Sequence, residues 1–232
     1  MKPDPDILKI LKSSEFASGL KQEKLIDVLT QGRHARLESD DILFSQGDPA
    51  VSCHLVLKGR LKLTKLHEQG REAIVRYIDP GQLTAAIAVF KGSEYPVTAL
   101  AVGRTEILSW NRKIMVHLMF KYPELAIKLL EVAVTRLDEI QTRYLELVAE
   151  QVDQRIARTL LRIMKHGGIK TSAGIEIPFP ISRQEMADYA GTTLFTVSRT
   201  LSVWEKKGWI KSGREKITIT NVHALVLFSE IG

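Results

Sequence analysis

Cysteine is scarce in this sequence, and long apolar runs are absent. The single thiol, Cys53, cannot form an intramolecular disulfide, and one cysteine is too few to hold zinc in a thiol cluster or an iron–sulfur centre. The longest apolar stretches, Ala85 to Phe90 and Ala224 to Phe228, are far shorter than the about 20 residues that cross a bilayer. The first residues, MKPDPDILKILKSS, lack the apolar core of a signal peptide. We therefore expect a cytoplasmic protein with no membrane partner.

Patterns typical of enzymes are also missing. The chain has no P-loop, no Ser/His/Asp set, no metal-binding pair and no carboxylate pair with supporting context, so an enzyme is the least favoured class. Hydrophobic residues make up 44% and charged residues 26% of the 232 positions, a composition typical of folded domains. This length allows one large domain or two ordinary ones, each with its own core.

Charge is distributed unevenly along the chain. Residues 1–150 hold 21 Lys and Arg against 20 Asp and Glu, whereas residues 151–232 hold 12 against 7. The basic C-terminal part is suited to a polyanion, because neutralising phosphates and releasing their counterions drives nucleic-acid binding. Many basic domains bind no nucleic acid, so the charge alone does not identify the partner.

The N-terminal half changes its pattern at residue 33. Residues 5–30 have the apolar spacing of short helices, whereas residues 33–110 are short apolar runs separated by turns such as Asp79-Pro80-Gly81. In HLVLKGRLKL the leucines that alternate with other residues are Leu55, Leu57, Leu61 and Leu63. This alternation predicts strands, and the spacing of the turns favours an all-β roll or barrel.

A long helix is predicted from Pro123 to about Leu147, where no glycine and no internal proline occurs. Its apolar residues recur every seven positions in two series, as in the seam of a coiled coil: Leu130, Ala133, Leu137, Ile140, Tyr144 and Leu147. We expect this helix to pack against its copy in a homodimer. The alternative is an amphipathic helix that covers its own domain. A further helix should run from about Gln151 to His166 and end at Gly167-Gly168.

Residues 182 to 208 carry the pattern of a helix-turn-helix. Ser182 and Glu185 have the spacing of a capping box, which predicts a helix start, and Gly191 ends that helix. After a Gly-Thr-Thr turn, a second helix from about Thr193 to Lys207 can pack back on the first. In duplex DNA such a second helix lies in the major groove.

The outer face of the second helix is left to contact bases. Its residues are Thr193, Leu194, Phe195, Ser198 and Arg199. An arginine can bind O6 and N7 of guanine together, a serine can bond a base edge, and a phenylalanine can touch the methyl group of thymine. Arg199 could instead be a surface or ion-pair residue, and Phe195 could fold back into its own domain.

A β wing should follow Gly208, with Trp209-Ile210 entering one strand and Ile217 and Ile219 alternating on the return strand. The wing cations and residues at the helix starts are expected to contact the DNA backbone: Ser182, Arg183, Thr196, Lys211, Arg214 and Lys216. Such contacts position a protein without reading sequence.

Several stretches together match the motifs of one protein family. They are ILFSQGDPA, HLVLKGRLKL, Gly81-Gln82-Leu83 before the apolar run to Phe90, QRIARTLLRI, and SRQEMADYAGTTLFTVSRTL with its wing. Over nearly its whole length the chain resembles the CRP/FNR family of bacterial transcription regulators. The resemblance implies an α+β fold in three parts: an effector-sensing β-roll (a jelly roll like cyclic-nucleotide-binding domains) over residues 1–122, a dimerisation helix over 123–150 and a winged helix-turn-helix DNA-binding domain over 151–232.

The resemblance also implies a homodimer on a palindromic site in double-stranded DNA. Ser198 and Arg199 stand where FNR-like members carry the Ser-Arg that reads the half-site. Phe195 replaces the family's usual glutamate, so the operator is not predicted beyond a guanine for Arg199. Activating members contact RNA polymerase through a loop that corresponds to the Gly-rich segment His166 to Gly174. The sequence does not separate an activator from a repressor.

The predicted effector pocket of the roll is apolar. It comprises Ala85, Ala86, Ile87, Val97, Thr98, Ile140 and Gln141, with Val89 and Leu100 as further interior residues. Members that bind cyclic AMP carry a carboxylate and an Arg-Ser pair where Ala86, Val97 and Thr98 align, and adenine-contacting hydroxyls where Ile140 and Gln141 align. A buried phosphate without its arginine would be an unpaired charge. The resemblance therefore argues against cyclic AMP, and against a nucleotide-binding module that serves a signalling partner.

The signal itself stays open. The lone cysteine excludes an FNR-type iron–sulfur sensor. The Tyr-Pro-Val-Thr-Ala pattern is similar to that of nitric-oxide-responsive members thought to use haem, whose axial ligand would come from His54, His67 or His117. Alternatively, another small effector acts, or the expression level alone controls the regulator. Cys53 could be a redox sensor, but its strand neighbours favour a small core residue.

Overall fold

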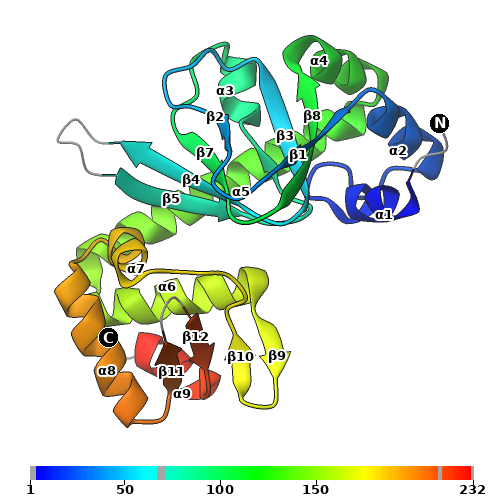
Figure 1. Cartoon of the computed structure of the whole chain (residues 1–232). Helices are drawn as coiled ribbons and strands as arrows, with labels where there is room; N and C mark the ends of the chain where they lie inside the picture. Colours follow the sequence, from blue (N-terminus) through cyan, green and yellow to red (C-terminus); the bar gives the residue numbers. More distant parts are fainter. Residues whose placement is uncertain (1–3, 67–71, 214–215, 231–232) are drawn as a thin grey trace. The chain divides into compact units, whose positions relative to one another are not determined.

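The computed structural model describes residues 4–66, 72–213 and 216–230 (Figure 1). The chain divides into two compact units, residues 1–139 and 140–232, and the division falls inside the long helix. Each unit has its own apolar core. Two residues that the sequence singled out, His67 and Arg214, lie outside the described ranges. Among the described helices, none combines the length and apolar character needed to cross a membrane.

The first unit is a β-roll with helices at both ends of its sequence (Figure 1). Two four-stranded antiparallel sheets have the strand orders β1-β8-β3-β6 and β2-β7-β4-β5. The elements are α1 (Pro5–Ser13), α2 (Gln22–Thr30), β1 (Arg33–Leu37), β2 (Ile42–Phe44), β3 (Ser52–Lys58), β4 (Leu61–Leu66), β5 (Glu72–Ile78), β6 (Leu83–Thr84), α3 (Ala86–Lys91), β7 (Thr98–Ala101), β8 (Thr105–Asn111), α4 (Arg112–Lys121) and α5 (Pro123–Ala149). The predicted roll and long helix are confirmed.

Gly59 makes the turn that sends the chain from one sheet to the other. Its φ is +78°, and a Cβ at this position would lie 2.3 Å from the carbonyl oxygen of Arg104. Only glycine fits such a close approach in this conformation. Thr105 holds the next residue, because its Oγ1 accepts a hydrogen bond from the Arg60 N–H (3.2 Å) and donates one to the Arg60 carbonyl oxygen (3.0 Å). The strands β3 and β4 are therefore consecutive in sequence but belong to different sheets.

Strand β3 is buried on both of its faces. Cys53, Leu55 and Leu57 are buried, and so are the residues between them, His54 and Val56. The strand is covered on both sides because the roll interior takes one face while α1 and α3 contact the strand as well. A strand buried on both faces often has a continuous apolar run, and Leu55-Val56-Leu57 is such a run.

The apolar run after Gly81 folds differently from the expected pocket wall. Residues 86–91 form helix α3, which starts from Ala85 in the left-handed conformation (φ 66°) and ends at Gly92. The helix turns Ala88 and Val89 inward and leaves Ile87 59% exposed. Ile87 was predicted to line the roll interior, and this is wrong because the helical period, not the strand period, sets its direction.

The second unit completes α5 and adds a compact domain of helices and one antiparallel sheet (Figure 1). Its elements are α6 (Val152–Gly167), β9 (Ile169–Thr171), β10 (Gly174–Glu176), α7 (Arg183–Ala190), α8 (Leu194–Lys206), β11 (Ile210–Gly213), β12 (Lys216–Ile219) and α9 (Val222–Glu230). The sheet has the order β11-β12-β10-β9. The segment from residue 166 to 174, expected to be a loop, contains strand β9, which pairs with β10 as a hairpin and extends the sheet of the wing.

Candidate nucleic-acid interface

The capping box at Ser182 begins the helix-turn-helix as predicted. Its Oγ accepts a hydrogen bond from the Glu185 N–H (3.0 Å), and Oε2 of Glu185 accepts one from the Ser182 N–H (2.8 Å). Helix α7 ends at Gly191, whose φ of 63° is left-handed. Arg155 on α6 fixes the turn that follows, because it donates to the carbonyl oxygens of Ala190 (3.1 Å) and Gly191 (3.2 Å). The role of Arg155 was not predicted, since no local pattern marks a contact over 35 residues.

Helix α8 has a buried and an exposed face. The buried stripe has helical spacing and comprises Val197, Thr200, Leu201 and Trp204. On the opposite face Phe195 is 74% exposed, Arg199 is exposed and Ser198 is half-buried. Ser198 and Arg199 lie three and four positions after Phe195, so the three residues share one side of the helix. The structure thus leaves Phe195 outside the domain core, in contrast to the alternative in which it folds back.

Arg199 is available for an outside partner. Its guanidinium forms no hydrogen bond or ion pair with any residue that the structure describes, which argues against the alternative of an internal ion pair. The side chain lines a hollow of about 390 Å³ together with Val152 at the start of α6 and Lys207 at the end of α8. The hollow thus holds two cations of α8, together with one carboxylate, Asp153, at the start of α6.

The start of α8 is fixed by its N-cap. Oγ1 of Thr193 accepts a hydrogen bond from the Thr196 N–H (3.2 Å), and the two hydroxyl oxygens are 3.0 Å apart. Leu194 is 46% exposed and lines a second hollow of about 460 Å³ with Ser182, Arg183 and Ser212. The interface residues of α7, of α8 and of the wing therefore surround one surface of the second unit.

The wing is fixed to the recognition helix by Glu205. One carboxylate oxygen accepts hydrogen bonds from the N–H (2.7 Å) and the hydroxyl (2.8 Å) of Ser212 on β11. These bonds to Ser212, with a smaller contribution from the charge of Arg183, hold the pKa of Glu205 below its ordinary value. Lys211 and Lys216 are exposed on the two wing strands and form no ion pair with a described residue. Glu205 itself was missed, because from sequence it is one of many surface acids.

The seam residues of α5 face outward. Leu130, Leu137, Ile140, Tyr144 and Leu147 are each more than half exposed, and Ala133 is partly exposed. In the first unit, the opposite side of α5 contributes Leu125 and Leu129 to the core of the roll. The alternative, in which these residues cover their own domain, is wrong, because they are exposed. They form an apolar surface along a helix of 27 residues.

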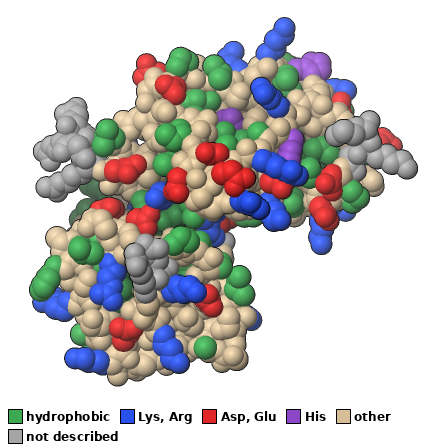
Figure 2. All heavy atoms as spheres, viewed as in Figure 1, with side chains coloured by type: hydrophobic (Ala, Val, Ile, Leu, Met, Phe, Trp, Pro, Cys, Tyr) green, Lys and Arg blue, Asp and Glu red, His purple; other side chains and the backbone are tan. Residues whose placement is uncertain are grey.

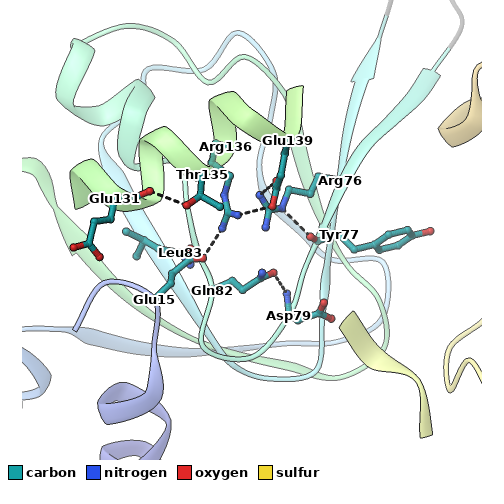
Figure 3. Close-up of polar contacts among 10 residues, drawn as sticks. All are labelled: Glu15, Arg76, Tyr77, Asp79, Gln82, Leu83, Glu131, Thr135, Arg136 and Glu139. Atoms are coloured by element: carbon teal, nitrogen blue, oxygen red, sulfur yellow. Dashed lines mark hydrogen bonds and ion pairs between the residues drawn. The ribbon is translucent and has the colours of Figure 1, made fainter. Parts of the chain in front are cut away.

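An alternating series of charges joins α5 to the roll (Figure 3). Arg136 on α5 donates to Glu15 (2.5 Å) and to Glu139 (3.1 Å), and the second oxygen of Glu139 accepts from Arg76 on β5 (2.9 Å). The second oxygen of Glu15 accepts from the Leu83 N–H at the start of β6 (2.7 Å). Two arginines and two carboxylates neutralise one another along this series. No local pattern predicts this series, since Glu15 and Arg136 are 121 positions apart.

Three residues of the predicted effector pocket are packed into the roll. Ala85 and Val97 pack against the core of the first unit, as does Ala86. Thr98 is half-buried, and its Oγ1 accepts a hydrogen bond from the Gln46 N–H (3.0 Å). Ile140 and Gln141 are exposed on the part of α5 that belongs to the second unit.

The residues proposed as sensors differ sharply in burial. Cys53 is fully buried, its thiol donates to the Trp110 carbonyl oxygen (3.5 Å), and burial raises its pKa to about 12. Such a thiol stays protonated and unreactive, in agreement with the interpretation of Cys53 as a small core residue. Burial lowers the pKa of His54 to about 4; its Nδ1 lies 2.8 Å from the Ser109 hydroxyl, while Nε2 has no described partner. His117 is exposed on α4.

Comparisons with known proteins agree with this arrangement. The family profile of the Crp-like helix-turn-helix domain matches residues 154–228, and that of the cyclic nucleotide-binding domain matches residues 34–122. Together the two matches span well over half of the chain.

Individual relatives resemble the chain over most of their own length. The nitrogen fixation regulation protein FixK of Bradyrhizobium diazoefficiens is 28% identical over 200 residues, 86% of this chain and 83% of that protein. The cyclic AMP receptor protein of Thermus thermophilus is 28% identical over 203 residues, 88% of this chain and 91% of that protein. The structure of FixK2 from Bradyrhizobium japonicum has the same fold, with a TM-score of 0.74 at 24% identity, covering 84% of this chain and 96% of that one. The chain therefore belongs to the CRP/FNR family of DNA-binding transcription regulators.

Proposed function

We propose that the chain binds DNA as a homodimer, with α8 of each copy in the major groove over one half of an inverted repeat. The observation that carries the proposal is the outer face of α8, where Arg199 has no described partner beside Ser198. An arginine so placed can bind O6 and N7 of guanine, which fixes one base of each half-site. Arg183 and the wing lysines then hold the DNA backbone.

The homodimer is supported by the apolar surface of α5. Exposed leucines at coiled-coil spacing are covered most simply by the same surface of a second copy, because a twofold interface pairs each patch with itself. Two copies related in this way carry two recognition helices. A DNA site with the same twofold symmetry matches them.

The experiment is selection of binding sites from random duplex DNA by the purified full chain. We expect enrichment of an inverted repeat that contains a conserved guanine in each half, with half-site centres about 10 base pairs apart or a multiple of this spacing. Enrichment of a single half-site would contradict the dimer. Retention of DNA without any enriched sequence would contradict the proposed base reading.

We propose that the effector is not a cyclic nucleotide. Arg76 and Arg136, which flank the face of α5 toward the roll, are neutralised by Glu139 and Glu15 (Figure 3). A cyclic phosphate that bound either arginine would have to displace a carboxylate, and an anion beside an unpaired carboxylate is repelled. Melting curves with and without millimolar cyclic AMP or cyclic GMP test this, and we expect no shift of Tm. A saturable rise of Tm would contradict the proposal.

A haem-based gas sensor is the second candidate, favoured by a single observation. His54 is buried, its neutral ring is suited to bind a metal, and its Nε2 has no described partner. Against this, the ring stacks on Phe44 at 5.6 Å, and Phe44 stacks on Tyr95 at 4.1 Å, so a haem would have to displace aromatic rings. Titration of the protein with haem under anaerobic conditions, followed by nitric oxide, tests the haem candidate. A saturable Soret band lost in His54→Ala supports haem; non-saturating uptake leaves another effector, or control by expression level.

We propose that the β9–β10 hairpin contacts RNA polymerase when the protein activates transcription. Its exposed first strand carries Ile169, which is 55% exposed, and Lys170. Ile169→Ser with Lys170→Ser should abolish activation in a transcription assay while leaving DNA affinity unchanged. Full activation by this variant would exclude the hairpin.

A further inference from the structure

Phe195 is the most exposed large apolar side chain of α8, ahead of Leu194 (46% exposed) and Val203 (45%). The ring is 74% exposed, lies outside the core of the second unit, and stands one helical turn before Ser198 and Arg199 on the same face. The packing of α8 does not require it, because Val197 and Leu201 make the inward contacts of this turn. A ring that stays in water gains nothing from folding, so its apolar surface remains available for burial against another molecule.

Leu194, the neighbouring apolar residue, is directed elsewhere. It lines the hollow that also contains Ser182, Arg183 and Ser212, between α7 and the wing. Phe195 lines neither of the two hollows beside α8. The two residues therefore present separate apolar surfaces, and only Phe195 shares the face of Arg199.

The edges of base pairs in the major groove offer one apolar group. They present hydrogen-bond donors and acceptors, and in addition the 5-methyl group of thymine. A phenyl ring has no donor or acceptor of comparable strength, so against a polar edge it would remove water without replacing its hydrogen bonds. Against the methyl group it buries apolar surface on both sides.

We infer that Phe195 reads the 5-methyl group of a thymine in the same half-site as the guanine bound by Arg199. This inference rests on the proposed function, since it needs α8 in the major groove. One helical turn is about 5.4 Å, and base pairs follow one another at about 3.4 Å. The thymine therefore lies about one or two base pairs from the guanine, on either strand. Phe195 is in this sense a residue that determines specificity.

The test replaces thymine by deoxyuridine, which pairs identically and lacks only the methyl group. Each thymine of the selected site is replaced in turn, symmetrically in both half-sites, and affinity is measured with the full-length dimer. We expect one position, within two base pairs of the conserved guanine, to lose about fivefold to twentyfold in affinity, roughly one buried methyl group in each half-site. Phe195→Ala should bind the thymine and the deoxyuridine sites equally while keeping its preference for the guanine.

Leu194→Ala is the matched control, because it removes a neighbouring apolar side chain from a different surface. It should keep the deoxyuridine penalty at that position. Since Phe195 is exposed, its replacement should leave the melting temperature unchanged, which excludes misfolding as a cause. If Phe195→Ala retains the penalty, or no thymine near the guanine shows one, the inference is wrong while the DNA-reading function stands. If the wild-type chain selects no sequence, both fail.

Discussion

The roll of the first unit and the recognition surface of the second unit differ in how their charged side chains are paired. In the first unit, arginines are paired internally: Arg60 forms a buried ion pair with Asp79, and Arg136 lies between two carboxylates. On the recognition surface of the second unit, Arg199 and the wing lysines have no acidic partner among the described residues. Figure 2 agrees, since acidic and basic side chains are interspersed over the visible face of the roll, whereas basic ones dominate that of the DNA-binding unit.

This difference shows which unit is built to meet a polyanion. Unpaired cations on a surface are held apart by their own repulsion and gain most when phosphates arrive. Paired charges gain little from an anion, because each bond to it replaces one already made. The roll therefore uses Arg60, Arg76 and Arg136 to hold elements together. The second unit also has internal pairs, such as Arg162 with Glu146, but it leaves Arg199 and the wing lysines for a partner.

The largest expected effect comes from the surface that joins two copies. Leu137→Glu places a charge in the seam of α5, so the chain should become a monomer and lose about 100-fold or more in operator affinity, because the second half-site no longer acts at high local concentration. Light scattering and a binding titration measure both effects. Thr142→Glu adds the same charge at an exposed position outside the seam and should leave a dimer. A dimeric Leu137→Glu variant would remove α5 from the interface.

The next effect concerns the core of the roll. His54 has its pKa lowered by burial from 6.5 to about 4, so the folded chain holds it neutral while the unfolded chain takes up a proton below pH 6.5. Stability from this site is present above pH 6.5 and is lost as the pH falls toward 4, by about 3 kcal/mol in total.

Urea unfolding between pH 7 and pH 4 measures this loss. His54→Phe should remove that part of the pH dependence, whereas His117→Gln, at an exposed position on α4, should retain it. An identical pH profile in His54→Phe and the wild type would show that His54 is accessible to protons in the fold.

A smaller effect is expected for the charge series between α5 and the roll. Arg136→Met leaves Glu15 and Glu139 without their shared partner and should cost about 2 kcal/mol of unfolding free energy, since the guanidinium side chain is only 16% exposed. Arg104→Met breaks an exposed pair with Glu38 and should cost less than about 0.5 kcal/mol. Equal losses of unfolding free energy in the two variants would mean that the charge series stabilises the fold no more than an exposed ion pair does.

The smallest effect is expected at the joint between wing and recognition helix. Glu205→Ala removes both hydrogen bonds to Ser212 and should cost about 1 kcal/mol, with a few-fold loss of DNA affinity that is equal on specific and random DNA. Because the pKa of Glu205 is lowered, this contribution is present at neutral pH and declines as the carboxylate is protonated in acid. Ser212→Ala keeps the backbone hydrogen bond and should lose less. A loss confined to the specific site would assign Glu205 to base reading instead.

The sequence predicted the helix-turn-helix well because its signals are local. The capping box at Ser182, the glycine at 191 and the inward spacing of α8 each act within a few residues, and all three appear in the structure. The seam of α5 is also a local period. Such features follow from backbone geometry alone.

The roll was predicted less well because its decisive contacts are distant in sequence. The burial of both faces of β3 depends on α1 and α3, and the pairing of Glu15 with Arg136 joins the two ends of the first unit. The run from Ala85 to Phe90 is apolar in either conformation, so only its surroundings select a helix. Short apolar runs of this kind are ambiguous by periodicity.

The central claim is that Arg199 reads a base, and the most direct measurement is the affinity of Arg199→Ala for the selected operator and for random DNA. We expect a loss of about 5-fold to 150-fold on the operator. On random DNA we expect little change beyond that of Lys206→Ala, which removes the same charge from the far end of α8. Equal losses on both DNAs would contradict the claim and reduce Arg199 to a phosphate contact.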